Sequence, residues 1–229
     1  YNRKNIKYGT CAIKNLGFTI KKLKNLDVSK KQLSNFIEKR FLGRLTTGYT
    51  PRQELLKSNE QKKYLTKQQL LKKLKIFKKI KKIILIAPSA FADAPHVLGT
   101  QLIFRDYYDQ LESTLKFLSF KNLKEILWLV RPHPGYDDEN IVEDLVFKLK
   151  NRELIHCCTK KIISTLNLVD ICDNVVGGRG TIGLEFACGG KYPIIAGSAT
   201  YSGLGIAIQP KTQKEYFKNL LEINKIKKM

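Results

Sequence analysis

The sequence has no long hydrophobic run, no paired cysteine motif and only three histidines. Its apolar stretches fall well short of the roughly 18 residues that a membrane-spanning helix needs, so we expect no transmembrane segment. The chain opens at Tyr1 without a basic-then-apolar leader, and we expect that a segment preceding it is missing. The cysteines are odd in number, none has C-x-x-C spacing, and the histidines add no ligand pattern. We therefore expect no metal site, and reduced, mostly buried thiols in a cytosolic protein. The cysteines are Cys11, Cys157, Cys158, Cys172 and Cys188.

Arginine is also scarce, with 8 arginines beside 34 lysines. The bidentate arginine fork is the usual reader of DNA bases, so this composition argues against a specific nucleic-acid partner. The net charge is nevertheless +22, and residues 1–82 carry 24 Lys/Arg against 4 Asp/Glu, whereas residues 83–229 carry 18 against 16. Such a basic segment fits an anionic membrane surface, nucleic acid or an acidic polymer. AT-rich coding explains the positive charge equally well, because Lys, Asn and Ile are all frequent in this sequence.

The change of composition near residue 83 predicts two parts. Residues 1–82 form a basic, mostly helical segment, with helices expected from Ser29 and over residues 65–82. The run of lysines at residues 72–82 could form a membrane-surface helix or a solvated helix that leads into a strand. Residues 83–229 form the second part, in which short apolar, β-branched runs alternate with helical stretches.

This alternation predicts an α/β domain, a Rossmann-like parallel sheet with flanking helices. We expect strands at residues 83–87, 126–130, 154–158, 174–176, 193–196 and 207–208, and helices at residues 106–120, 137–150, 162–169, 181–188 and 211–221. The helix at residues 137–150 is expected to open on the acidic residues Asp137, Asp138 and Glu139.

Polar residues gather in four loops that follow the predicted strands. Ligands of open parallel sheets bind outside the carboxyl ends of the strands, so this convergence predicts a binding site at that edge. The four groups are Ser89, Asp93 and His96; Arg131 and His133; residues 177–181; and Ser198, Thr200, Tyr201 and Ser202.

The third loop reads Gly178-Arg179-Gly180-Thr181-Ile182-Gly183, formally G-x-G-x-x-G between a strand and a helix. Glycines let the backbone approach a phosphate or diphosphate at a helix start. Binding of a nicotinamide dinucleotide would need an acidic residue about 20 residues further on, and none lies between Glu185 and Glu215. A tight turn with close helix–sheet packing is the alternative. Glu185 could accept hydrogen bonds from a ribose or pair with Arg179.

Two histidines are candidates for chemistry. His133 lies between two prolines just past a buried strand, where it could bind a phosphate and stabilise a departing nucleotide. His96 follows Asp93-Ala94-Pro95 and could act as an acid/base or as a phosphate contact. His156, beside two cysteines in a predicted strand, is expected to be structural.

Together these stretches resemble a family. Arg131-Pro132-His133-Pro134 is similar to the histidine–proline motif of bacterial transferases with cytidine-nucleotide donors, such as the Kdo and sialyltransferases of capsule and lipopolysaccharide assembly. Residues 176–187 resemble the later glycine and serine/threonine motif of that family, and residues 190–196 resemble the turn and strand that follow it. The resemblance extends over about residues 83–222.

The resemblance implies a GT-B architecture with two Rossmann-like domains. Residues 83–229 would be the C-terminal, nucleotide-sugar-binding half, and residues 1–82 an extension or a remnant of the acceptor domain. It implies an inverting, metal-independent transfer without a cofactor, from a cytidine-linked sugar to a glycan or lipid-linked glycan at the inner face of the cell membrane. The donor and its phosphate would be held by Arg131, His133, Gly178, Arg179, Gly180, Thr181, Glu185 and Ser202.

The family's acidic-acidic-glycine motif, which supplies the catalytic base in sialyltransferases, is absent, so either this fragment lacks the base or Asp93 or His96 takes that role. Two alternatives stay open. One is a nucleotide-sugar epimerase of similar fold. The other is a basic module for membranes or nucleic acid, which rests on residues 1–82 alone.

Overall fold

The computed structural model describes residues 65–96, 101–133, 138–159, 162–163 and 165–226. All of them belong to one compact unit, and residues 1–64 lie outside the described residues. The strands are β1 (Lys82–Ala87), β2 (Ile126–Val130), β3 (Ile155–Cys157), β4 (Asn174–Gly177) and β5 (Ile194–Ile195). The helices are α4 (Lys67–Lys73), α5 (Tyr107–Lys121), α6 (Glu139–Phe147), α7 (Thr165–Ile171), α8 (Ile182–Cys188), α9 (Gln213–Leu221) and the 3-10 turn η1 (Ile223–Lys225).

The five strands form one parallel sheet in the order β3-β2-β1-β4-β5. The prediction of a Rossmann-like α/β domain is therefore confirmed. β1 is the central strand, and Ile83, Ile84 and Leu85 have no exposed surface. Apolar side chains on both faces of a strand require a layer of helices on each side of the sheet, which the connections between parallel strands supply.

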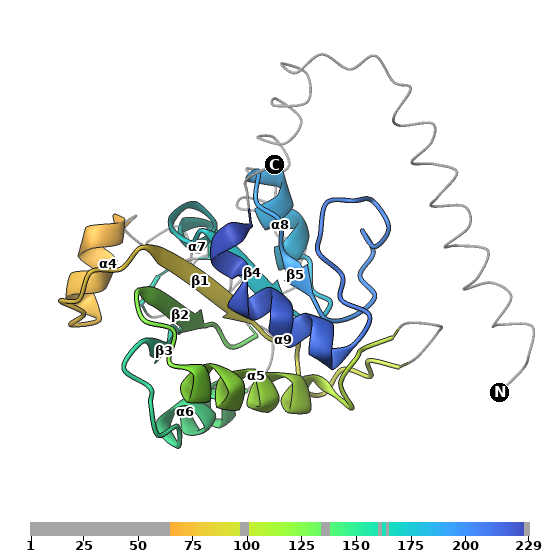
Figure 1. Cartoon of the computed structure of the whole chain (residues 1–229), viewed down its shortest axis with the longest axis horizontal. Coiled ribbons are helices and arrows are strands. Elements are labelled where there is room, and N and C mark those ends of the chain that lie inside the picture. Colours follow the sequence, from red (N-terminus) through yellow and green to blue (C-terminus); the bar gives the residue numbers. More distant parts are fainter. Residues whose placement is uncertain (1–64, 97–100, 134–137, 160–161, 164, 227–229) are drawn as a thin grey trace, which may run out of the picture. The chain divides into compact units, whose positions relative to one another are not determined.

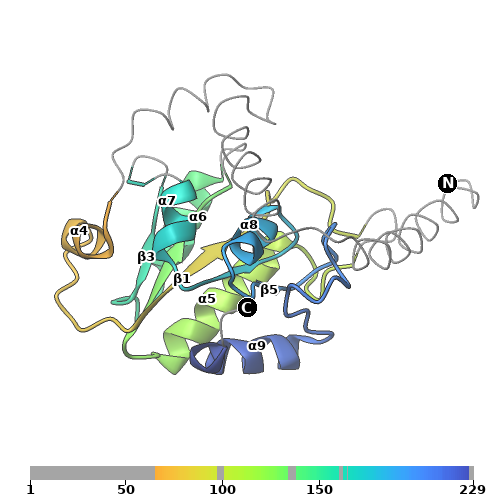
Figure 2. The ribbon, with the colours of Figure 1, turned by 90° about the horizontal axis from the view of Figure 1, so that it is seen from above.

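Helices cover both faces. Alternate residues of β1 and β2 point to opposite faces, so Ile84 and Trp128 pack with α5, α6 and α9, whereas Leu85 and Leu129 pack with α4, α7 and α8. Figure 1 shows α5 and α9 in front of the strands, and Figure 2 shows them on one side of the sheet with α7 on the other. The core is thus a three-layer α/β/α sandwich.

Residues 65–82 belong to this domain. Leu70 of α4 is fully buried and Ile76 is 9% exposed, both among the side chains that pack on β1. The helix predicted over residues 65–82 is wrong beyond its first half, because α4 ends at Lys73 and Lys75 has a φ of 56°. The lysine-rich run at residues 72–82 is therefore a short helix end followed by an irregular segment, and not one membrane-surface helix. The basic stretch before it lies outside the described residues.

Most other elements match the sequence pattern. The glycine-rich end of α8 is confirmed as a helix terminus, with Gly189 as C-cap and Gly190 at a φ of 73°. The sixth strand expected at residues 207–208 is only a single parallel bridge between Ile194 and Ile208. Asp138 precedes α6, but its side chain makes no capping bond there.

Among the described residues, no helix has the length and apolar character to cross a membrane.

The described cysteines are free thiols. Cys158 and Cys172 are buried, Cys157 is half-buried and Cys188 is exposed, so the prediction of mostly buried thiols holds for part of the set. Burial raises the pKa of Cys158 to about 11, which keeps this thiol protonated and unreactive near neutral pH.

We predict that Leu70→Ala lowers the free energy of unfolding by about 2–5 kcal/mol, because the substitution leaves a cavity in the core beneath α4. Phe77→Ala, seven residues later at a side chain that is 88% exposed, should change it by less than about 0.5 kcal/mol. Urea unfolding followed by circular dichroism measures both. Equal stability of Leu70→Ala and the unchanged chain would show that α4 does not belong to the folded core.

Candidate functional site

The strand order creates a switch point at the carboxyl edge of the sheet. From β1 the chain winds through β2 and β3 to one side, then crosses to β4 and β5 on the other side. The last residues of the two strands beside the switch, Ala87 of β1 and Gly177 of β4, are paired neighbours. The loops that follow these strands therefore leave the sheet next to each other. Ligands of doubly wound sheets bind at such a point, where neighbouring loops diverge.

The loops at this edge are hydrogen-bonded to one another. The backbone N–H of Phe91, after β1, donates to Asp138 Oδ2, after β2, at 3.1 Å. The hydroxyl of Tyr201, after β5, donates to the carbonyl of Gly180, after β4, at 3.0 Å. Asp138 thus holds two loops together where the sequence predicted an acidic helix start.

A second connection joins the loops after β1 and β5. Leu102 and Gly197 form an antiparallel bridge, and the hydroxyl of Ser198 accepts a hydrogen bond from the Gln101 backbone N–H at 3.1 Å. A Cβ on Gly197 would lie 2.9 Å from the Gln101 carbonyl oxygen, so only glycine permits this approach. Ser198, one of the polar residues noted in the sequence, therefore has a structural contact.

Three buried polar atoms have no hydrogen-bond partner among the described residues: Ser89 Oγ, Gln110 Oε1 and Arg131 Nε. These side chains are 8%, 4% and 5% exposed. Ser89 follows β1, Arg131 follows β2 directly, and Gln110 Oε1 lies 2.8 Å from where a Cβ on Gly178 would stand. A buried polar atom left without a partner costs about 1–3 kcal/mol. Their gathering at one edge of the sheet indicates a place where a polar ligand can complete the hydrogen bonding.

Arg179 brings positive charge to the switch point, beside the buried phenol of Tyr107. Tyr107, the first residue of α5, is 2% exposed, and its ring carbons would lie 2.8 and 2.9 Å from a Cβ on Gly178. Burial raises the pKa of the Tyr107 phenol, and the charge of the Arg179 guanidinium, with a hydrogen bond from it, acts in the opposite direction. Arg179 is thus a half-buried cation directly after β4 and close to the phenol.

The glycines of the turn after β4 differ in how much space surrounds the position that a Cβ would take. Gly178 allows the start of α5 to approach, and a Cβ on Gly183 would lie 2.1 Å from the Tyr201 hydroxyl oxygen. Gly180 is different, because its Cβ would meet nothing closer than Ile182 Cγ2 at 3.9 Å, and the residue is exposed. Internal packing therefore explains Gly178 and Gly183 but gives no reason for glycine at position 180. Glycine at position 180 would be explained by a ligand that approaches the backbone of the turn.

The guanidinium of Arg131 is hydrogen-bonded to the backbone through one of its nitrogens. Its Nη1 donates to the carbonyls of Cys158 at 3.0 Å and Ile163 at 2.9 Å, which ties the end of β2 to the segment after β3. No carboxylate lies within ion-pair distance of it among the described residues. Burial lowers the pKa of the guanidinium, because removing its charge from water is unfavourable. A bound anion would offset that cost.

His133 is half-buried and lies two residues past Arg131 on the same loop. Pro132 before it is buried, so the first half of the predicted rigid turn is anchored to the domain. Pro134 lies outside the described residues, and the restraint from a second proline stays a prediction.

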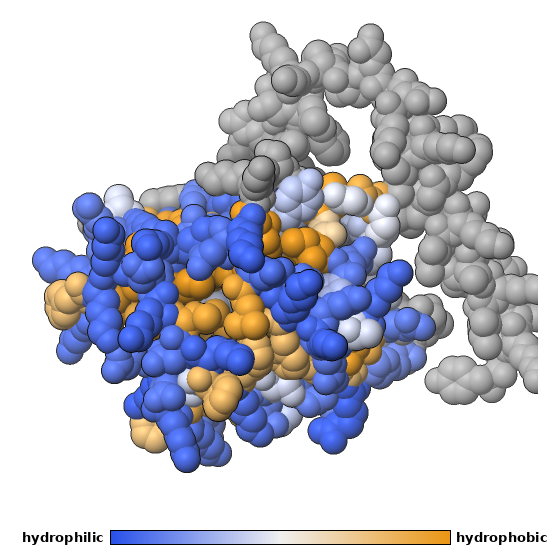
Figure 3. Space-filling view, in the orientation of Figure 1, coloured by the Kyte–Doolittle hydropathy of each residue, from blue (hydrophilic) through white to orange (hydrophobic). Residues whose placement is uncertain are grey.

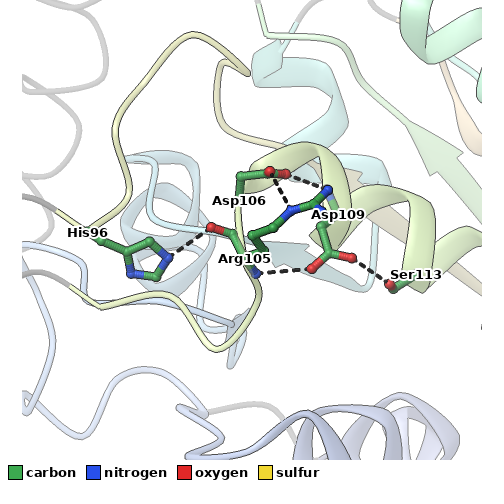
Figure 4. A network of polar contacts seen from close by, with 5 residues as sticks. All are labelled: His96, Arg105, Asp106, Asp109 and Ser113. Atoms are coloured by element: carbon green, nitrogen blue, oxygen red, sulfur yellow. Dashed lines mark hydrogen bonds and ion pairs between the residues drawn. The ribbon is translucent and has the colours of Figure 1, made fainter.

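His96 is exposed on the loop after β1 and belongs to the polar network of Figure 4. Its Nε2 lies 2.9 Å from the carbonyl oxygen of Arg105, whose backbone N–H donates to Asp109 Oδ2 at 3.0 Å. Arg105 Nε also contacts Asp106 Oδ2 at 3.2 Å, and Ser113 donates to Asp109. If the neutral ring donates from Nε2, Nδ1 is left as an acceptor. Asp93, on the same loop, is exposed.

The remaining predicted ligands lie around α8 and after β5. Thr181 is the exposed N-cap residue of α8, and Glu185 is half-buried in its first turn. Ser202 Oγ accepts hydrogen bonds from the Ala199 N–H at 2.8 Å and from Gln209 Nε2 at 2.5 Å. The Ser202 hydroxyl therefore shapes its own turn, and a role in donor binding stays a prediction.

Sequence reasoning did not identify Tyr107, Gln110 and Asp138 as residues that build this edge. It also missed the packing role of Tyr201. Tyr107 and Gln110 read as ordinary positions of an amphipathic helix, and only the strand order places that helix start beside the glycine turn.

No group of three His, Cys, Asp or Glu side chains in the described part of the chain is arranged to hold a metal ion. The charged groups of the candidate site are instead the cations Arg131 and Arg179, and His133 follows Arg131 by two residues.

No protein-family model matches this chain, and no curated protein sequence matches it. Solved structures do. The β-Kdo 2,7 transferase KpsC of Thermosulfurimonas dismutans matches with a TM-score of 0.43 and 17% identity, over 74% of this chain and 49% of that one. A glycosyl transferase family 9 protein of Veillonella parvula matches with a TM-score of 0.44 and 10% identity, over 70% and 43%. The β-Kdo 2,4 transferase KpsC of T. dismutans matches with a TM-score of 0.37 and 16% identity, over 76% and 54%. The chain thus spans about half of these proteins, and the similarity concerns the fold alone.

We predict that Gly183→Ala lowers the free energy of unfolding by about 1–3 kcal/mol, because the new methyl group collides with the Tyr201 hydroxyl. The same substitution in a Tyr201→Phe background should cost less, since the hydroxyl is gone. Gly180→Ala is the matched control and should change stability by less than about 0.5 kcal/mol. A double-mutant cycle in urea measures the coupling, and additive effects would contradict the proposed contact.

Proposed function

We propose that this chain forms the donor-binding half of a GT-B glycosyltransferase, which transfers a sugar from a cytidine-linked nucleotide sugar to a growing surface polysaccharide. One observation carries the proposal: the family-like glycine turn lies at the switch point, beside buried polar atoms that lack partners. The motif that resembles the histidine–proline pair leaves the same edge from β2. The two short motifs therefore belong to one surface, as a nucleotide-sugar site requires.

The donor phosphate is placed over Gly180, on the side where the turn is open. Arg179 and Thr181 flank this position, and His133 approaches from the neighbouring loop. Glu185, in the first turn of α8, is assigned to the ribose hydroxyls. Arg131 anchors the loop of His133 through its two carbonyl contacts and adds positive charge beneath it.

The chemical step is displacement of the nucleotide from the anomeric carbon by an acceptor hydroxyl, with inversion at that carbon. Negative charge develops on the departing phosphate, and preorganised cations and hydrogen-bond donors stabilise it without a metal ion. Arg179 and His133 take this role in the proposal. His96 Nδ1 or Asp93 accepts the proton of the acceptor hydroxyl, and both lie on the loop after β1 beside the switch point.

Residues 83–229 bind the donor, and the acceptor, a glycan or lipid-linked glycan, is bound by another part of the whole enzyme. The enzyme acts in the cytoplasm, at the inner face of the cell membrane.

A nucleotide-sugar epimerase of similar fold would use the same phosphate contacts. It would release free nucleotide from the donor with no acceptor present and form no lengthened glycan. A purely basic binding module would show no selectivity among nucleotides, and its binding would weaken steeply with salt.

We predict that CMP or CDP raises the thermal midpoint of the chain, whereas UDP, GDP and NAD do not. At about 100 times its dissociation constant, a selective ligand stabilises the fold by roughly 2.7 kcal/mol. His133→Ala and Thr181→Ala should each remove most of this shift, because they delete phosphate contacts. Differential scanning fluorimetry with the five nucleotides is the measurement.

The matched control is His156→Ala. This histidine lies on β3 with its Nε2 on the Glu153 carbonyl at 2.9 Å, away from the carboxyl-edge loops. It should leave the shift unchanged. A shift with UDP alone would reject the cytidine donor, and a shift that survives both His133→Ala and Thr181→Ala would reject the site.

A further inference from the structure

Three phenylalanines are the most exposed large apolar side chains of the described residues. Phe77, Phe120 and Phe147 are 88%, 79% and 68% exposed, whereas the other exposed large apolar side chains are 37–43% exposed. An exposed phenylalanine is unfavourable in water, so three of them in one region call for a reason.

All three lie at the amino edge of the sheet, opposite the candidate site. Phe77 is in the segment that leads into β1, Phe120 is near the end of α5 just before β2, and Phe147 is the last residue of α6 before β3. β1, β2 and β3 are adjacent parallel strands, so these three segments meet at one edge. In Figure 1 this edge is on the left, beside α4.

The segments are bonded to one another. The Lys81 backbone N–H donates to the Glu125 carbonyl at 2.9 Å, and Lys81 Nζ pairs with the Glu125 carboxylate at 2.7 Å. Lys78 pairs with Glu153 of the segment before β3. The three phenylalanines therefore belong to one continuous surface, which we call the amino-edge surface and define as residues 75–82, 120–125 and 147–154. Lys73 is not part of it, because its Nζ donates to the Ile162 carbonyl on the segment after β3.

The amino-edge surface is strongly basic. It contains 10 Lys/Arg and 2 Asp/Glu, and both acids are already paired with lysines. The other eight cations have no carboxylate within ion-pair distance in the described part of the chain. Figure 3 shows this side as hydrophilic surface with separate apolar patches at its rim.

We propose that the amino-edge surface docks on a bilayer that contains anionic lipid. The phenylalanine rings enter the interfacial region, and the surrounding cations contact the headgroups. Apolar side chains amid Lys and Arg are what interfacial binding requires, because neither apolar burial nor charge alone holds a protein stably at a membrane. Two of the rings already lie beneath a cation, with Lys121 Nζ 5.4 Å from the Phe120 centroid and Arg152 Cζ 4.4 Å from that of Phe147.

Single-stranded nucleic acid is the other polyanion to consider, and the structure fits it less well. Stacked bases need open aromatic faces along a groove, but one face of Phe120 and one of Phe147 are covered by those cations. A hollow between Leu123 and Leu154 at this edge holds only about 10 Å³, room for one water and not for a base. Nine of the ten cations are lysines, which lack the arginine fork for phosphates.

This inference is independent of the proposed sugar transfer, because vesicle binding needs neither nucleotide nor acceptor. The sequence already predicts membrane association for residues 1–82. The amino-edge surface extends this prediction to residues 120–125 and 147–154, which lie elsewhere in the chain.

The test uses the fluorescence of the full chain carrying Phe77→Trp. Its only other tryptophan, Trp128, is 2% exposed in the core. Vesicles of phosphatidylglycerol and phosphatidylcholine should shift the emission of the new tryptophan to shorter wavelength, and vesicles of phosphatidylcholine alone should not. The readout is local, so binding of residues 1–64 to the same vesicles cannot imitate it. Replacing all three phenylalanines by serine should lower the affinity in co-sedimentation by roughly ten-fold or more.

The matched control is Ile141→Trp, in the first turn of α6 at the opposite edge and 43% exposed. Its emission should not change with vesicles. An unchanged emission of Phe77→Trp on vesicles that carry the protein would overturn the proposal. So would quenching of that tryptophan by oligouridylate without a shift on vesicles, which would assign the surface to nucleic acid.

Discussion

Burial of β1 on both faces and along both edges is the constraint on which the rest of the structure depends. Ile83, Ile84 and Leu85 are fully buried, with β2 on one side and β4 on the other. A parallel strand in this position can only be flanked by crossover connections, so the chain must wind first one way and then the other. The reversal separates the loops after β1 and β4 and opens the edge between them. The location of the candidate site therefore follows from the hydrophobic burial of one strand.

The turn after β4 serves packing and binding with different residues. Gly178 and Gly183 allow α5 and Tyr201 to approach closely, and this packing holds the loops around the switch point in place. Gly180 lies between them with open space on its outer side. A rigid turn with one open backbone position is suited to a phosphate, since the groups that meet the ligand are held by contacts that the ligand does not share. The packing interpretation and the phosphate interpretation of the motif are therefore compatible, because they concern different glycines.

The apolar runs were sufficient to predict the strands and the α/β class, because strands buried on both faces need residues such as those of β1 and β2. The end of α4, the single bridge at Ile208 and the contact of Asp138 with the loop after β1 were not predictable in this way. Each depends on a partner far away in the sequence: α4 on the sheet face, Ile208 on Ile194, and Asp138 on Phe91. For the same reason the loops of the site could be named from sequence, but Gln110 and Tyr107 could not, because only the strand order brings α5 to the glycine turn.

The amino-edge surface combines cations with exposed phenylalanine rings, and only the rings point to a partner. Helix α5 ends at that edge, and a helix C-terminus favours cations, so Lys121 has a reason within the fold. Lysines alone would therefore say little about binding. No such reason applies to the phenylalanines, because the core packing of α5 and α6 uses other positions and would be the same with polar residues at 120 and 147. The exposed rings, rather than the charge, distinguish a docking surface from an ordinary basic edge.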